Sequence, residues 1–213
     1  MNPRALRRAA LAALVPVCSV FIGTVFAAPQ DDFNAGRKAY LAGDVVAAMT
    51  PLRRAADAGH APAQSLYGYI LEKAEYNEEA AQYFRRAAEQ GDADGQYGLG
   101  LLYAMGEGVA RDPAAAREWL ERAGNQNHGL AVVALSQAFL AGRLGFKTDP
   151  ADAEGLGWVR KAGELDSIPA LSYLAQGYRS GAFGALDPKQ AERLEARIRE
   201  LSPDNNRRKG KKK

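Results

Sequence analysis

Residues 93–109 of the chain read ADGQYGLGLLYAMGEGV, and residues 110–124, which follow, read ARDPAAAREWLERAG. In the first stretch small and large residues recur at helical spacing, which places one set of them along a single helix face. The residues of this face are Gly95, Leu99, Gly100 and Tyr103. Glycines end the first helix, and Asp112 followed by Pro113 forms an N-cap with proline at the first helical position. The two stretches therefore predict a helix–loop–helix hairpin.

The same pattern recurs along the chain at offsets of 32, 36 and 39 residues. Four segments end alike, and they are Leu52–His60, Phe84–Asp92, Leu120–His128 and Val159–Ser167. With these offsets, a column of small residues also aligns at Gly68, Gly100, Ser136 and Ala175. A column of large residues follows at Leu71, Tyr103, Phe139 and Tyr178. One register that aligns separate columns indicates an internal repeat, in which small residues let helices approach closely and large ones fill the adjoining grooves.

The predicted fold class is all-α, a right-handed α-solenoid of stacked antiparallel helix hairpins, because one hairpin cannot bury both of its apolar sides. We expect this repeat domain over residues 31–201. Its units span about residues 31–60, 61–92, 93–128, 129–167 and 168–201. Asp149-Pro150 and Asp187-Pro188 are expected to restart helices as Asp112-Pro113 does.

The fourth unit departs from the pattern. It carries an insertion around residues 144–147, and it has Gly155 and Gly157 where alanine would favour a helix.

These residues resemble the Sel1-like repeat, a relative of the tetratricopeptide repeat. The residues that carry the resemblance are the run 93–109, Asp112-Pro113, Ala116, Trp119, Leu120 and Ala123. The resemblance extends over about residues 33–200 and is specific for the fold, whereas such families share architecture and little chemistry. It implies that the first helix of each hairpin lines a concave groove.

The groove positions are then those outside the packing columns. They are Ser65, Tyr69, Glu72, Asp94, Tyr97, Leu101, Val133, Gln137, Leu140, Ser172, Gln176 and Arg179. Tyr69 and Tyr97 add rigid aromatic area with a polar tip, which suits peptide recognition. We take seven of these as partner-binding candidates, and they are Tyr69, Glu72, Asp94, Tyr97, Gln137, Gln176 and Arg179. The alternative is that some of the positions pack against the next repeat.

The N-terminus has the pattern of a signal peptide, which we predict over residues 1–27. Arginines precede a mostly apolar run, and Val25-Phe26-Ala27 supplies the residue types that a signal peptidase reads. The predicted location is therefore periplasmic or secreted. The alternative is an inner-membrane anchor left uncleaved, since the run of about 18–20 residues could span a bilayer. Pro16 favours the signal peptide, and cleavage would also remove Cys18, the one cysteine of the chain.

The C-terminus is predicted to be a disordered basic tail over residues 202–213. Its cations are Arg207, Arg208, Lys209, Lys211, Lys212 and Lys213. Together with the N-terminal arginines these cations account for the formal charge of +3, because the rest of the chain carries about −6. The tail either binds an anionic envelope surface or serves as a solubilising end. It lacks interleaved aromatic residues, so we expect no nucleic-acid partner.

No motif of enzyme chemistry stands out. His60 and His128 occupy a repeat column shared with Asp92 and Ser167, which predicts a turn that starts the next helix rather than a metal or catalytic pair. The aromatic column with Trp119 is typical of core packing. We therefore predict no enzyme, no metal and no cofactor.

The leading hypothesis is a monomeric, non-enzymatic scaffold or adaptor in a bacterial periplasm that binds a protein or peptide in its groove. Alanine and arginine richness favours a bacterial source. Two alternatives stay open. One is an enzyme or regulator that acts on cell-wall material, and the other is a structural protein held at the envelope by its basic tail.

Overall fold

The computed structural model describes residues 28–202, which form ten α-helices and no strand within that range. The first five are α1 (Pro29–Leu41), α2 (Val45–Asp57), α3 (Ala61–Lys73), α4 (Asn77–Glu89) and α5 (Ala93–Met105). The others are α6 (Pro113–Asn125), α7 (Gly129–Leu140), α8 (Ala153–Glu164), α9 (Ile168–Ser180) and α10 (Pro188–Leu201). The all-α prediction is confirmed. The predicted signal peptide, and the predicted tail beyond residue 202, lie outside the described residues.

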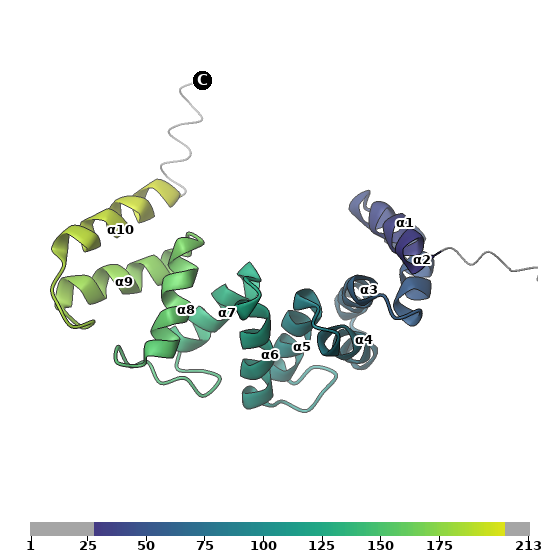
Figure 1. The fold of residues 1–213 in the computed structure, drawn as a ribbon, viewed down its shortest axis with the longest axis horizontal. Coiled ribbons are helices and arrows are strands. Elements are labelled where there is room, and N and C mark those ends of the chain that lie inside the picture. The colour runs from purple at the N-terminus through teal and green to yellow at the C-terminus, as the bar shows by residue number, and fades with distance from the viewer. Residues whose placement is uncertain (1–27, 203–213) are drawn as a thin grey trace, which may run out of the picture.

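The helices pack as sequential hairpins, α1 with α2 and so on to α9 with α10. Each hairpin also contacts the next, so the array bends into an open crescent with α1 and α10 at its two ends (Figure 1). Within residues 28–202, no helix combines the length and the apolar character needed to cross a membrane.

A repeated N-cap starts the first helix of a hairpin. The Nδ1 atoms of His60 and His128 accept hydrogen bonds from backbone N–H groups three residues ahead, each at 3.2 Å. Asp92 does the same for α5 at 2.9 Å, and Ser167 stands at the equivalent place before α9 without such a bond. The column that the sequence assigned to a turn is therefore confirmed as a capping position.

Two of the three Asp-Pro pairs start helices, and the third does not. Asp112 caps α6 and Asp187 caps α10. The prediction that Asp149-Pro150 restarts a helix is wrong, because α8 begins at Ala153 with Asp152 as its cap. Asp149 instead caps a turn by accepting from the backbone N–H of Ala151 at 2.8 Å.

The insertion in the fourth unit folds back onto the core. Phe146 is buried and meets Phe139 edge to face, with 6.0 Å between ring centroids. The guanidinium of Arg117 lies 3.8 Å from the centroid of the Phe146 ring. Arg117 also pairs with Glu154 of α8 at 2.8 Å, so one side chain holds the loop and two helices together. Because the residues between α7 and α8 form this packed loop, α8 begins only at Ala153.

The two glycines of α8 have different surroundings. A Cβ atom on Gly155 would lie 2.1 Å from the Phe139 ring, so the helices meet there at a distance that only glycine allows. A Cβ on Gly157 would meet nothing within 4 Å. The close approach of Phe139 therefore accounts for glycine at position 155, whereas nothing in the structure explains the glycine at position 157.

Glutamines form a polar ladder between the first three hairpins. Gln64 donates to the carbonyl of Ala56 at 2.9 Å, and Gln90 donates to Gln64 at 2.7 Å. The arrangement recurs one unit later, where Gln96 donates to the carbonyl of Ala88 and accepts from Gln126. The equivalent residues of the next unit are Val132 and Leu165, so the ladder ends there.

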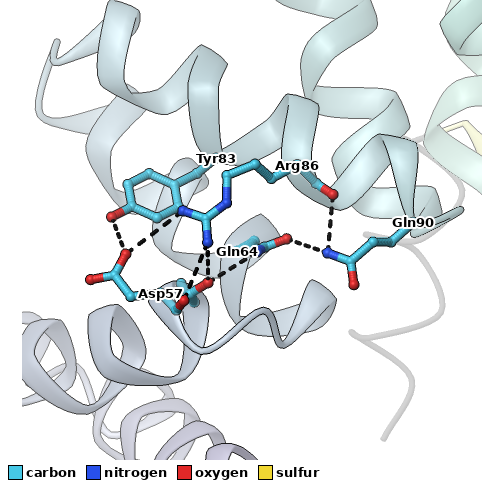
Figure 2. A network of polar contacts seen from close by, with 6 residues as sticks. Asp57, Gln64, Tyr83, Arg86 and Gln90 are labelled. Carbon is cyan, nitrogen blue, oxygen red and sulfur yellow. Dashed lines mark hydrogen bonds and ion pairs between the residues drawn. The ribbon is translucent and has the colours of Figure 1, made fainter.

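Figure 2 shows the first rung of this ladder beside a tyrosine–aspartate contact. Tyr83 donates to Asp57 at 2.8 Å, and Arg86 donates to the carbonyl of Ala56 at 2.8 Å (Figure 2). Burial, and next the hydrogen bond to Asp57, raises the pKa of Tyr83 to about 12. Tyr83 therefore keeps its proton throughout the physiological range.

We expect Gly155→Ala to destabilise the protein by about 1–3 kcal/mol, because the added methyl would overlap the fully buried Phe139 ring. Gly157→Ala is the matched control on the same helix. It should stabilise the protein by about 0.5–1 kcal/mol, through helix propensity alone. Urea unfolding followed by circular dichroism measures both changes. Equal effects of the two substitutions would contradict this account of α8.

Gln96→Ala should lower the free energy of unfolding by about 1–3 kcal/mol, because it removes two hydrogen bonds of the buried Gln96 side chain, one to the Ala88 carbonyl and one from the Gln126 amide. Gln82→Ala, at an exposed position of α4, should change it by less than about 0.5 kcal/mol. The same denaturation measurement compares the two variants. A cost for Gln96→Ala no larger than that for Gln82→Ala would show that the ladder adds no stability.

Candidate partner-binding groove

The first helices of the first three hairpins, α1, α3 and α5, line a groove of about 750 Å³ that reaches the start of α7. Its floor includes Phe84, a residue of α4 whose ring lies between α3 and α5. Four large apolar side chains at its edge are well exposed to solvent: Leu41 (72%), Tyr69 (41%), Met105 (50%) and Leu130 (62%). A cluster of exposed apolar side chains around one hollow is typical of a binding surface.

Aromatic rings give the groove a rigid wall. Tyr40 of α1 meets Tyr69 of α3 edge to face, with 6.4 Å between centroids. Tyr97 of α5 stacks against His128 at 4.9 Å. Burial raises the pKa of Tyr40 and of Tyr97, with Tyr69 adding to the effect at Tyr40. The phenols stay neutral at physiological pH and offer hydrogen-bonding tips on an apolar surface.

Most charged side chains of the groove have partners within it. Lys73 pairs with Glu72 at 3.1 Å and lies 5.2 Å from the centroid of the Tyr69 ring. The Nε2 atom of His128 lies 2.9 Å from a carboxylate oxygen of Asp94, and this hydrogen bond holds the pKa of Asp94 below its ordinary value. Arg37 is exposed and has no hydrogen-bond or ion-pair partner among residues 28–202.

The structure brings four of the seven predicted site residues together in this groove, and they are Tyr69, Glu72, Asp94 and Tyr97. Gln137 lines a neighbouring hollow, which shares Leu101 and Met105 with the groove. Gln176 lies in a separate hollow near Phe183. Arg179 lines none of these three hollows, and it pairs with Glu195 of α10 at 2.7 Å. Ser65 lines the groove wall but is buried and donates to Asp92 at 2.6 Å, so it packs at the repeat junction.

The contribution of α1 to the groove was not predicted from the sequence. Phe33, Arg37, Tyr40 and Leu41 all line the groove. The offset of 32 residues that relates the second hairpin to the third also relates Arg37 to Tyr69. Applying this offset toward the N-terminus could therefore have identified Arg37 as a groove residue. His128 was assigned to a turn, and it is both a helix cap and a part of the groove wall.

The described residues hold no group of three or more His, Cys, Asp or Glu side chains arranged to bind a metal ion. One pair of acids does come together at α6 and α8. Glu121 and Glu154 both contact Arg117, and burial raises the pKa of Glu121. Because Arg117 lies between them and against Phe146, this cluster holds the insertion in place.

Residues 61–92 and 93–128 each match the Sel1 repeat model. The chain therefore carries two Sel1 repeats, over residues 61–128. These two Sel1 repeats are the α3–α4 and α5–α6 hairpins, which supply most of the groove. Among curated proteins, none matches this Sel1 repeat protein.

Two solved structures share the fold. A Sel1 repeat protein from Oxalobacter formigenes is 27% identical, with a TM-score of 0.63 over 80% of this chain and 70% of its own. A protective antigen present in uropathogenic Escherichia coli strains, which displays the same repeat fold, is 27% identical with a TM-score of 0.71. That match covers 81% of this chain, which spans only 38% of the antigen.

The pKa of Asp94 tests the contact between α5 and α7. We expect its carboxyl to titrate below the ordinary value of about 3.9 and to return toward it in His128→Asn, a substitution that keeps a capping side chain. Because the folded-state pKa is lowered, the contact stabilises the fold above the ordinary pKa and loses its effect as the pH falls through the folded-state value. Carbon-13 NMR of the side-chain carboxyl measures this.

The matched control is His60→Asn, since the Nε2 atom of His60 contacts Gln30 and not an acid. That variant should leave the titration of Asp94 unchanged. An Asp94 pKa that does not respond to His128→Asn would rule out the histidine as the cause.

Proposed function

We propose that this Sel1 repeat protein is a non-enzymatic scaffold or adaptor, which binds a protein or peptide partner in the groove of α1, α3 and α5. The observation that carries the proposal is the set of exposed apolar side chains gathered around that one hollow. Solvent exposure of Leu41 and Met105 is unfavourable in the free protein, and a partner that covers them recovers the free energy of apolar burial. Sel1 repeats typically mediate protein interactions, which supports the same role.

We further propose that the protein acts in the bacterial periplasm. The basic, apolar and small-residue pattern of residues 1–27 supports export. The resemblance of the chain to proteins of Oxalobacter formigenes and Escherichia coli supports a bacterial source. Electrostatic attraction of the basic residues 207–213 to an anionic envelope surface would keep the scaffold near the membrane.

An enzyme acting on cell-wall material is the second candidate, and it would need two acids that converge where a substrate can bind. Glu121 and Glu154 do come together, and Arg117 contacts both of them. The guanidinium of Arg117 also lies against the buried Phe146 ring, so this cluster is better suited to holding the insertion than to binding a substrate. The exposed apolar groove therefore supports partner binding more directly than this acid pair supports catalysis.

The proposal predicts that Tyr69→Ala combined with Tyr97→Ala abolishes capture of a specific partner, because both substitutions remove the aromatic wall of the groove. The partner is first identified by photocrosslinking in periplasmic extract, with a benzoylphenylalanine placed at Leu41 or Met105. Its affinity for the purified protein is then measured by calorimetry. The double variant should weaken binding at least about a hundredfold.

Tyr76→Ala is the matched control, since this tyrosine is 63% exposed and lies at the turn before α4, outside the groove. Binding should survive in this variant. A partner that crosslinks as well from position 76, or that binds the double variant with unchanged affinity, would contradict the proposal.

A further inference from the structure

One position of the groove changes its chemistry from hairpin to hairpin. The repeat offsets of 32, 32, 36 and 39 residues relate the members of a single column. They are Arg37, Tyr69, Leu101, Gln137 and Gln176. The first three line the groove side by side on α1, α3 and α5. Along this column the groove is therefore cationic on α1 and apolar on α3 and α5.

Arg37 lies within the apolar face of α1. Phe33 precedes it by four residues, and Leu41 follows it by four, so the three side chains share one helix face. A partner that covers Phe33 and Leu41 must also cover the guanidinium between them. Burial of a cation without a counter-charge is strongly unfavourable.

The groove itself offers no counter-charge to Arg37. Glu72 is paired with Lys73, and Asp94 with His128. No other acidic side chain lines the groove within the described residues. A partner that buries the α1 face therefore has to supply a negative charge of its own.

We propose that the partner is an extended peptide whose Asp or Glu side chain pairs with Arg37, with apolar side chains against Tyr69 and Leu101. This inference rests on the proposed function of the groove and adds the chemistry of the partner. Neighbouring helices pack about 8–10 Å apart, and an extended chain in the polyproline II conformation advances about 3.1 Å per residue and returns its side chains to the same side at every third residue. The acid and the first apolar side chain are therefore about three residues apart in the peptide, and the second apolar residue follows at the same interval.

A side-chain carboxylate fits this site better than a C-terminal one. Terminal carboxylates are captured by free backbone N–H groups, whereas Arg37 lies in the middle of α1, where the backbone N–H groups are bonded within the helix. A guanidinium on an open groove can pair with a carboxylate at any point along a peptide that passes over it.

The experiment selects binders from a random twelve-residue peptide library whose C-termini are fused to the display protein, so that only side chains can supply a carboxylate. The protein should enrich sequences with Asp or Glu about three residues from an aromatic or aliphatic residue. With Arg37→Glu, the selected peptides should bind at least about tenfold more weakly, and a new selection should enrich Lys or Arg at the position of the acid.

Lys38→Glu is the matched control, because it makes the same charge change at an exposed neighbour that does not line the groove. It should leave both affinity and selection unchanged. Enriched peptides without an acid, or equal binding by Arg37→Glu, would overturn the inference while groove binding stands. Binding that survives Tyr69→Ala with Tyr97→Ala would overturn the proposed function instead, and a library that yields no binder would overturn the inference of a peptide partner.

Discussion

The close packing of one phenylalanine between two glycines determines how the second and third hairpins stack. A Cβ atom on Gly98 of α5 would lie 2.6 Å from the Phe84 ring, and one on Gly68 of α3 would lie 3.2 Å from it. The ring of α4 therefore fits between α3 and α5 only because both helices lack a side chain there. This contact brings α3 and α5 together as direct neighbours and makes the ring the floor of the groove.

The two halves of the array are joined in different ways. Between the first three hairpins, buried Gln64 and Gln96 satisfy backbone carbonyls of the preceding helix, and this polar ladder permits one register. Beyond α6 the buried part of the junctions is apolar, with Phe139 and Trp158 as the large side chains, and the pair of Arg117 with Glu154 joins α6 to α8 without such a ladder. The groove therefore lies in the part of the array where directional hydrogen bonds add to close packing. A fixed register keeps residues from three helices in place before a partner arrives.

The helix hairpins could be predicted from the sequence because small and large residues recur in columns along the chain. The spacing of these residues within each unit is enough to identify a helix face. The failure at Asp149-Pro150 has a tertiary cause, because burial of Phe146 decides where the loop ends. The reason for glycine at position 155 is likewise tertiary, since the ring that it accommodates belongs to another helix. Tyr69 and Tyr97 were found because they stand outside the packing columns. Gln176 does not lie beside these tyrosines, because it is on α9 and the groove ends at the start of α7.

The capping histidine joins the fold to the groove. His128 accepts at Nδ1 from the backbone of α7, so its neutral ring carries the proton on Nε2 and directs it toward Asp94. The position of the ring is thus fixed by the start of a helix, and the ring in turn stacks on Tyr97. His60 makes the same arrangement with Phe33 and Gln30 at the other side of the groove. Aromatic side chains held in this way lose little rotamer freedom when a partner binds, which lowers the entropic cost of recognition at both edges.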